Sequence, residues 1–225
     1  MSSTAPIIKR RGRPPKIKNG EAGTRELLIR HGTAVLTEKG FASTGIGEIL
    51  KQTGIPKGSF YHYFPSKDAY GLAVVENYGT FFARKIDRWL QDKSRSPLTR
   101  LQDFIDDAKD GMCRYDFKRG CLIGNLGQEL GSLSETFRKP LEDIFLDWQR
   151  RVQICLDEAK DTGAIASTIN TKDSAALFWI SWEGAILRAK LVRSTDPIDL
   201  FTASFFTGLG TSHNSLKSIN KEHQQ

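Results

Sequence analysis

The sequence has little that would build a disulfide framework, a metal centre or a membrane span. Its three cysteines, Cys113, Cys121 and Cys155, are odd in number and widely spaced, which argues against disulfides and is consistent with a reducing cytoplasm. The chain contains no CxxC pair or HExxH motif and its four histidines are scattered, so we expect neither a metal nor a cofactor. No run reaches the ~18 apolar residues of a membrane span, and no apolar signal segment follows Met1.

Positive charge, by contrast, is concentrated in the first third of the chain. Residues 1–67 hold 12 of the 33 Lys and Arg residues but only 4 of the 26 acidic ones, an excess of +8, whereas residues 68–225 carry −1. Such asymmetry favours a nucleic-acid partner whose phosphates meet the basic part. The alternative is a solvated basic tail that has no partner.

We expect residues 1–22 to form a disordered basic arm. The sequence Arg-Gly-Arg-Pro that begins at Arg11 resembles the core of an AT-hook, a segment that lies extended along an AT-rich minor groove. Gly12 would permit close approach and Pro14 would keep the backbone extended, so that Arg11 and Arg13 reach into the narrow, negative groove. A non-specific basic tail remains the alternative.

Residues 23–70 have the pattern of three helices joined by two turns. The first is expected over 23–39. A second, capped by Thr44 or Gly45, ends before the turn glycine Gly54, and Pro56 suits the first turn of a short third helix. Phe60 and Phe64 lie four residues apart, so we expect both to be buried anchors of that helix. Its polar residues then stay outside, as in the second helix of a helix-turn-helix, which enters the DNA major groove.

The spacing of these residues resembles the DNA-binding domain of the TetR family of transcriptional repressors. The matching positions are Gly40-Phe41, Thr44, Glu48-Ile49, Thr53-Gly54-Ile55, Gly58-Ser59-Phe60-Tyr61, Phe64 and Lys67. The resemblance implies that double-stranded operator DNA is contacted by Lys57, Gly58, Ser59, Tyr61 and His62, with Tyr61 and Lys67 on the phosphate backbone. Thr44, at a helix N-terminus, would offer its hydroxyl and amide to another phosphate. An alternative for His62 is simple packing against Tyr63.

Beyond the DNA-binding domain, helical spacing of apolar residues continues to the end of the chain. It predicts helices over 67–91, 97–115, 121–130, 135–160, 172–193 and 197–209, and no strands. Ser66 is expected to cap the first of these helices, and Pro140 to kink the fourth. The fold class is therefore all-α. By resemblance, residues 71–210 form an effector-binding and dimerisation domain in which the last two helices make a homodimer, and residues 211–225 are a frayed tail.

Cys121 is the candidate effector residue. It begins a helix beside Lys118 and Arg119, and both a helix N-terminus and nearby cations lower the pKa of a thiol; a buried, inert thiol is the alternative. Three glycines, Gly124, Gly127 and Gly131, recur along one face of the same helix. Bare backbone there indicates either a closely packed helix or a small ligand.

Residues 119–122 and 184–190 resemble the TetR subgroup that contains the regulators of acrylate utilisation and of N-ethylmaleimide reductase. Its members respond to small, often electrophilic metabolites. We therefore hypothesise a pocket in which Cys121 reacts with, or lies beside, an unsaturated carboxylate or carbonyl compound. Trp182 would form a wall, Arg188 or Lys190 would hold the charged end, and Cys113 would assist as a second thiol.

Three other functions stay open on the sequence. The protein could be a repressor with a non-covalent hydrophobic ligand, a thiol enzyme that uses Cys121, or a basic architectural DNA binder that has no ligand. The favoured interpretation is a homodimeric, non-enzymatic repressor that reads a palindrome and is released by an effector.

Overall fold

The computed structural model describes residues 21–51 and 53–210, and these form nine helices without a strand, as the sequence predicts. The helices are α1 (Glu21–Lys39), α2 (Ile46–Leu50), α3 (Lys57–Tyr63), α4 (Lys67–Leu90), α5 (Pro97–Arg114), α6 (Leu122–Leu130), α7 (Glu135–Asp161), α8 (Thr171–Val192) and α9 (Asp196–Gly208). The expected basic arm, with Arg11 and Arg13, and the expected C-terminal tail lie outside the described residues. None of the described helices combines the length and apolar character that crossing a bilayer requires.

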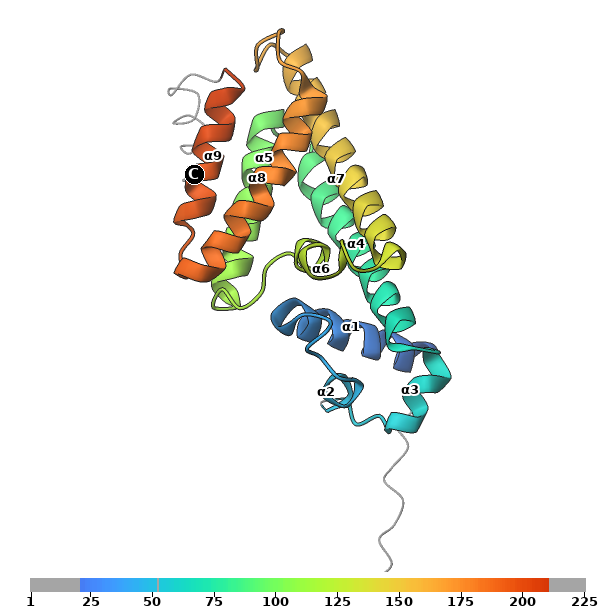
Figure 1. Cartoon of the computed structure of the whole chain (residues 1–225). Helices are drawn as coiled ribbons and strands as arrows, with labels where there is room; N and C mark the ends of the chain where they lie inside the picture. Colours follow the sequence, from blue (N-terminus) through green and yellow to red (C-terminus); the bar gives the residue numbers. More distant parts are fainter. Residues whose placement is uncertain (1–20, 52, 211–225) are drawn as a thin grey trace, which may run out of the picture.

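Helices α1, α2 and α3 form a three-helix unit at one end of the molecule, and α4 runs from it into the larger part (Figure 1). Phe60 is fully buried and Phe64 nearly so, as predicted, and the ring of Tyr70 packs on both at 5.2 and 5.0 Å between centroids. The hydroxyl of Tyr70 donates to the carbonyl of Leu28, which ties α4 to α1. Short α3 is therefore fixed by two aromatic anchors, which leaves its polar face outside.

Backbone geometry defines the starts of α2 and α3. Gly45, the second of the two predicted caps, is the N-cap of α2, and the nearby Glu48 pairs with Lys39. Pro56 lies at the N-cap of α3, where its backbone is extended, so that α3 begins at Lys57. The predicted cap of α4 is confirmed, because the side chain of Ser66 accepts a hydrogen bond from the amide of Ala69.

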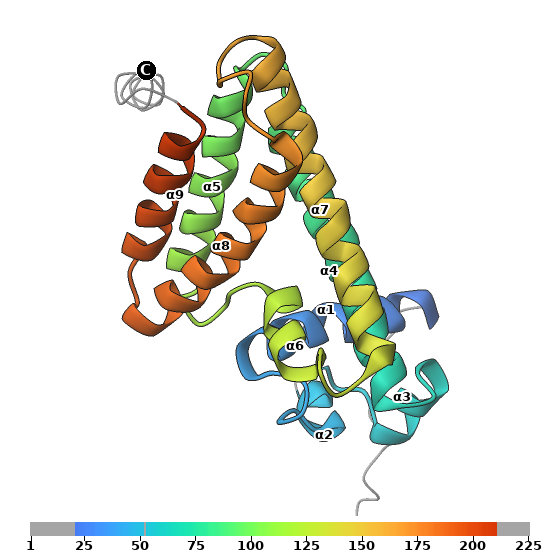
Figure 2. The ribbon, with the colours of Figure 1, turned by 45° about the horizontal axis from the view of Figure 1, so that its top comes forward.

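The larger part is built from long helices that pack side by side. Helix α7 lies along α4 in both views, and α5, α8 and α9 complete the layer (Figures 1 and 2). Its core is aromatic: the rings of Phe82, Phe104, Trp148, Trp179 and Trp182 contact one another. Trp179 and Trp182 are thus core residues, because their large rings are almost fully buried in this cluster.

Helix α6 lies between this layer and the three-helix unit (Figure 2). Near its C-terminal end, the carboxylate of Glu129 accepts hydrogen bonds from the backbone amides of Phe41 and Ala42, in the turn that follows α1. That turn needs Gly40, whose φ of 84° disfavours any side chain. One turn earlier, the amide of Asn125 donates to the carbonyl of Thr37 at 3.0 Å. Polar contacts therefore join α6 directly to the three-helix unit.

We expect Glu129→Ala to lower the free energy of unfolding by about 1–3 kcal/mol, because two backbone amides lose a charged acceptor. Denaturant titration followed by circular dichroism measures the change. Glu142→Ala, an exposed glutamate of α7, is the matched control and should stay within about 0.5 kcal/mol of the wild type. Equal stabilities of the two variants would contradict a structural role for the Glu129 contact.

Candidate DNA interface and effector cavity

The outer face of α3 presents most of the residues predicted to meet DNA. Lys57, Gly58, Tyr61 and His62 are exposed and Ser59 is half-buried. The ring of His62 also contacts the ring of Tyr63 edge to face, with 5.2 Å between the ring centroids. His62 therefore packs against Tyr63 and is still exposed to solvent. No Cβ clash restricts Gly58, which lies in open space. The face is therefore available to a groove, while Phe60 holds it from behind.

Thr44 and Lys67 are engaged within the protein. Thr44 is fully buried, and its hydroxyl donates to the carbonyl of Gly40 at 2.6 Å, so the prediction that this hydroxyl faces a phosphate is wrong. The ammonium of Lys67 donates to the carbonyl of Phe41 at 2.6 Å and lies 4.4 Å from the centre of its ring. Lys67 therefore holds the turn after α1, and its contact with a phosphate stays a prediction.

A cavity of about 760 Å³ lies where the three-helix unit meets the larger part. Its walls come from α1, α4, α5, α8 and the loop before α6. The residues that carry the argument below are Arg30 and Thr37 of α1, Tyr78, Phe82 and Lys85 of α4, Asp107 and Met112 of α5, Arg119 and Cys121 of the loop, and Trp182 and Ile186 of α8. Cys121 and Trp182 thus share one cavity, as predicted. Because α1 supplies one wall, a bound molecule would touch the three-helix unit directly.

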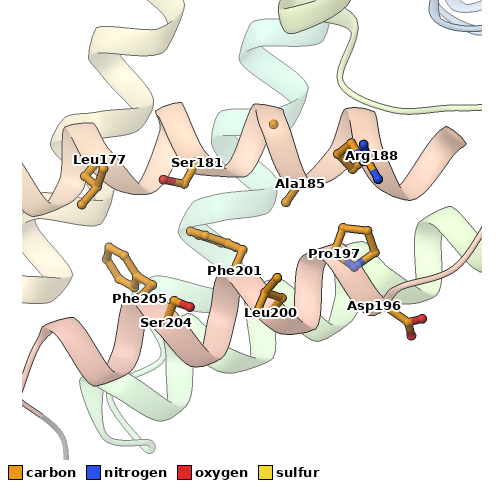
Figure 3. Close-up of a pocket in the computed structure, with 11 residues that line it drawn as sticks. Leu177, Ser181, Ala185, Arg188, Asp196, Pro197, Leu200, Phe201, Ser204 and Phe205 are labelled. Atoms are coloured by element: carbon orange, nitrogen blue, oxygen red, sulfur yellow. The ribbon is translucent and has the colours of Figure 1, made fainter. Parts of the chain in front are cut away.

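The other predicted effector residues lie elsewhere. Cys113 is exposed on α5 and is not part of the cavity wall. Arg188 is exposed and lines a separate groove of about 740 Å³ between α8 and α9, with Asp196 and Pro197 near it (Figure 3). Lys190 is half-buried and packs against Gly120, where a Cβ would come within 3.0 Å of its Cδ. The prediction that Arg188 and Cys113 join Cys121 in one pocket is therefore wrong.

Cys121 is the N-cap of α6 and is buried, with 5% of its surface exposed. Its sulfur accepts the amide of Gly124 at 3.4 Å. Burial and the nearby carboxyl of Glu183 nevertheless raise the pKa of the thiol well above its ordinary value, which corrects the predicted lowering. The two cations expected to lower it are paired away from it, Lys118 with Asp116 and Arg119 with Glu38.

Glu183 is a functional candidate that the sequence pattern did not single out. Its carboxyl lies against Gly124 of α6, where a Cβ would stand 1.8 Å from Oε2. Oε1 is buried and has no hydrogen-bond partner among the described residues. Burial raises the pKa of Glu183 to about 7, while its interaction with Cys121 partly opposes the rise. The signal in the sequence was that Glu183 is a single acidic residue in an otherwise apolar part of α8, which lies opposite a glycine of α6.

Tyr78 completes a group of three titratable side chains, of which Tyr78 and Cys121 are buried and Glu183 is half-buried. Its hydroxyl lies near the amide of Leu122, and burial raises its pKa well above the ordinary value, followed by the effect of Cys121. Tyr78 and Cys121 both face the cavity. A Cβ at Gly127 would meet nothing within 4 Å, whereas a Cβ at Gly131 would stand 2.5 Å from the carbonyl oxygen of Gly127. Of the three glycines, Gly124 and Gly131 therefore lack room for a side chain.

Comparisons with known proteins agree with this architecture. The family model for bacterial regulatory proteins of the tetR family matches residues 28–70, and that for the tetracyclin repressor-like C-terminal domain matches residues 97–205. The chain belongs to the TetR family of transcriptional regulators.

Two relatives and one solved structure place the chain within that family. The transcriptional regulator AcuR of Cereibacter sphaeroides is 46% identical over 208 residues, which cover 91% of this chain and 94% of AcuR. The HTH-type transcriptional repressor NemR of Escherichia coli is 29% identical, covering 81% and 92%. The crystal structure of a regulatory protein TetR from Rhodobacter sphaeroides matches with a TM-score of 0.79 and 48% identity, covering 82% of this chain and 97% of that one. The predicted resemblance to the acrylate and N-ethylmaleimide reductase regulators is confirmed.

Substituting the two glycines of α6 separates close packing from helix propensity. Gly124→Ala should be less stable than Gly127→Ala by about 1 kcal/mol, because its Cβ must displace the Glu183 carboxyl, which offsets the gain in helix propensity. Gly127→Ala has open space and should leave stability equal or raise it by up to about 1 kcal/mol. Thermal and denaturant unfolding of both variants measure this; a Gly124→Ala protein as stable as Gly127→Ala would contradict the placement of Glu183.

Proposed function

We propose that the protein is a homodimeric repressor which binds palindromic operator DNA through α3 and is released when a small electrophilic effector, an unsaturated carbonyl or carboxylate compound, occupies the cavity at Cys121. One observation supports this most directly. The cavity is lined both by Cys121, at the start of α6, and by α1 of the three-helix unit.

The DNA side of the proposal rests on α3. Lys57 can donate to guanine or to a phosphate and Ser59 to either type of base, while Tyr61 and His62 lie on the same exposed helix. A dimer would need its two α3 helices roughly 34–36 Å apart, or a multiple of that, to enter successive major grooves. An effector releases such a dimer only if it binds better to a conformation in which this spacing is wrong.

The dimer is supported by apolar side chains that the described part of the chain leaves uncovered. On α8, Ile180 is 70% exposed, and on α9, Leu200 is 71% exposed. The other exposed large apolar residues of α8 are Leu177, Leu187, Leu191 and Val192. Monomeric proteins rarely leave so many apolar groups together in water. A second copy packed on α8 and α9, beside the groove of Figure 3, would bury them.

Helix α6 offers a direct route from the effector to the DNA. Cys121 caps its first turn, so a group attached to the sulfur must disturb the hydrogen bond from Gly124. At the other end, Asn125 and Glu129 hold the end of α1 and the following turn. A shift of α6 would therefore pull on the three-helix unit.

A non-covalent ligand is the second candidate, favoured by the apolar part of the same wall. Phe82, Met112, Trp182 and Ile186 line the cavity, and its volume suits ligands larger than acrylate. A thiol enzyme gains less support, because no histidine stands among the described residues of the cavity wall to serve in turn as base and acid during turnover.

Replacing Lys57 tests the DNA-binding face. We expect Lys57→Ala to weaken operator binding by about 1–3 kcal/mol if the lysine reads a base, measured by fluorescence anisotropy at one fixed salt concentration. Lys139→Ala, an exposed lysine on α7, is the control of equal charge and should bind like the wild type. Unchanged affinity of Lys57→Ala would remove Lys57 from the interface.

Replacing the thiol tests the effector. Methyl vinyl ketone should release the wild-type protein from its operator, whereas Cys121→Ser should stay bound, because the weaker hydroxyl nucleophile does not add to the enone. Cys113→Ser keeps the cavity thiol and should respond like the wild type. Full release of Cys121→Ser would exclude thiol addition and favour the non-covalent ligand.

A further inference from the structure

We propose that Glu183 accepts the proton of the Cys121 thiol as the thiol adds to its effector, and that the site consequently takes electrically neutral α,β-unsaturated carbonyl compounds. This inference rests on the proposed function, because it supposes that Cys121 is the reacting group. It adds a residue with a chemical role and narrows the class of effector.

Geometry places the acceptor beside the thiol. The Cys121 sulfur accepts the amide of Gly124, and the Glu183 carboxyl covers the same glycine, with Oε2 1.8 Å from the position of a Cβ. Oε1 is buried and has no hydrogen-bond partner among the described residues. A buried oxygen without a partner costs free energy, and such groups are expected mainly where they have a functional role. Gly124 thus brings the Cys121 sulfur and the Glu183 carboxyl together at the first turn of α6.

A base is needed because the thiol does not ionise by itself. The thiolate is the nucleophile, and burial together with Glu183 keeps this thiol protonated at neutral pH. The carboxyl of Glu183, whose pKa is about 7, is in contrast partly ionised there and is poised to take a proton. The backbone amides of Ile123 and Gly124 favour negative charge on the sulfur once the proton has left.

The neighbouring groups are poorer acceptors. Tyr78, on α4, is itself protonated, because burial raises its pKa well above the ordinary value. Lys190 packs against Gly120 through its methylenes, and Arg119 is paired with Glu38 of α1 at 2.7 Å. Along the cavity wall, Lys85 and Asp107 are paired with each other at 2.8 Å. Glu183 is therefore the acceptor that faces Cys121.

The step balances without an oxidant or a reductant. The S–H bond breaks and its proton passes to the carboxylate of Glu183, while the sulfur forms a bond to the β-carbon of the effector. The C=C π electrons move to the α-carbon and the carbonyl oxygen, giving an enolate. Glu183 then returns the proton to the α-carbon, which leaves a thioether and the carboxylate regenerated.

Charge selects the effector. An ionised Glu183 repels a second carboxylate brought next to the sulfur, and like charges in a buried site cost more than in water. Arg188, predicted to neutralise such an acid, faces the other groove, and Arg119 and Lys85 are already paired. Arg30 and Arg114 also line the cavity, but neither is among the groups that shift the pKa of Glu183. An enone, enal or unsaturated ester lacks this repulsion, whereas free acrylate suffers it.

The test follows formation of the thioether by intact-protein mass spectrometry, in a Cys113→Ser/Cys155→Ser background that leaves one thiol. With methyl vinyl ketone, the rate of the parent protein should rise with a midpoint near pH 7 and then level off. Glu183→Gln should react at least tenfold more slowly at pH 7.5, and its rate should keep rising to pH 9. Glu142→Gln is the matched control, and Glu183→Asp, which retains a carboxylate, should recover part of the rate.

Two results would overturn the proposal. If Glu183 acted only through its charge, Glu183→Gln would lower the thiol pKa and react faster than the parent, which overturns the proposal. The ratio of the reaction rates with methyl vinyl ketone and with acrylate should be at least tenfold larger for the parent protein than for free glutathione. Glu183→Gln should lose that excess. Equal ratios for the parent protein and glutathione would overturn the charge selection. If the parent protein forms no thioether at all, the proposed function fails instead, and circular dichroism of each variant identifies loss of fold.

Discussion

Helix α6 is held at each end by a carboxyl group that lies against bare backbone. At its first turn Glu183 covers Gly124 beside the capping sulfur of Cys121, and near its end Glu129 accepts the amides of the turn that Gly40 makes possible. The hydrogen bonds of Glu129 are directional and the Glu183 carboxyl fills the space over Gly124, so small displacements of α6 disturb both contacts. In the proposed function, a group added at Cys121 would therefore shift α6, and with it the turn after α1.

The same arrangement explains why the cavity lies where it does. Its walls combine α1 of the three-helix unit with α4, which continues from that unit into the larger part (Figure 1). A molecule bound there contacts both sides of the junction. Coupling between effector and DNA then needs no long pathway, only a different preferred packing of α1 and α6 in the occupied protein.

Features set by neighbouring residues along the chain were predictable from sequence. The anchors Phe60 and Phe64 and the cap Ser66 follow from helical spacing and backbone chemistry, and all three are as expected. Thr44 and Cys121 were misjudged because their surroundings come from distant segments. A hydroxyl that looked like a cap is buried on Gly40, and a thiol placed to be acidic is surrounded by apolar wall and a carboxyl. The position of Cys121 at a helix N-terminus favours a lower thiol pKa, but burial among distant segments raises the pKa by more.

In the proposed function, burial and protonation of the thiol would make Cys121 selective. A thiol of low pKa would react with many oxidants and electrophiles in solution, whereas Cys121 exposes little surface and has a raised pKa, so it would ionise only when a neighbour removes its proton. Reaction then requires a molecule that enters the cavity, places an electrophilic carbon at the sulfur and tolerates a carboxylate beside it. On this proposal, slow intrinsic chemistry combined with a shaped cavity would convert general thiol reactivity into recognition of one class of compound, and the hydrogen bonds of Glu129 at the far end of α6 would carry that event to the turn behind the DNA-binding face.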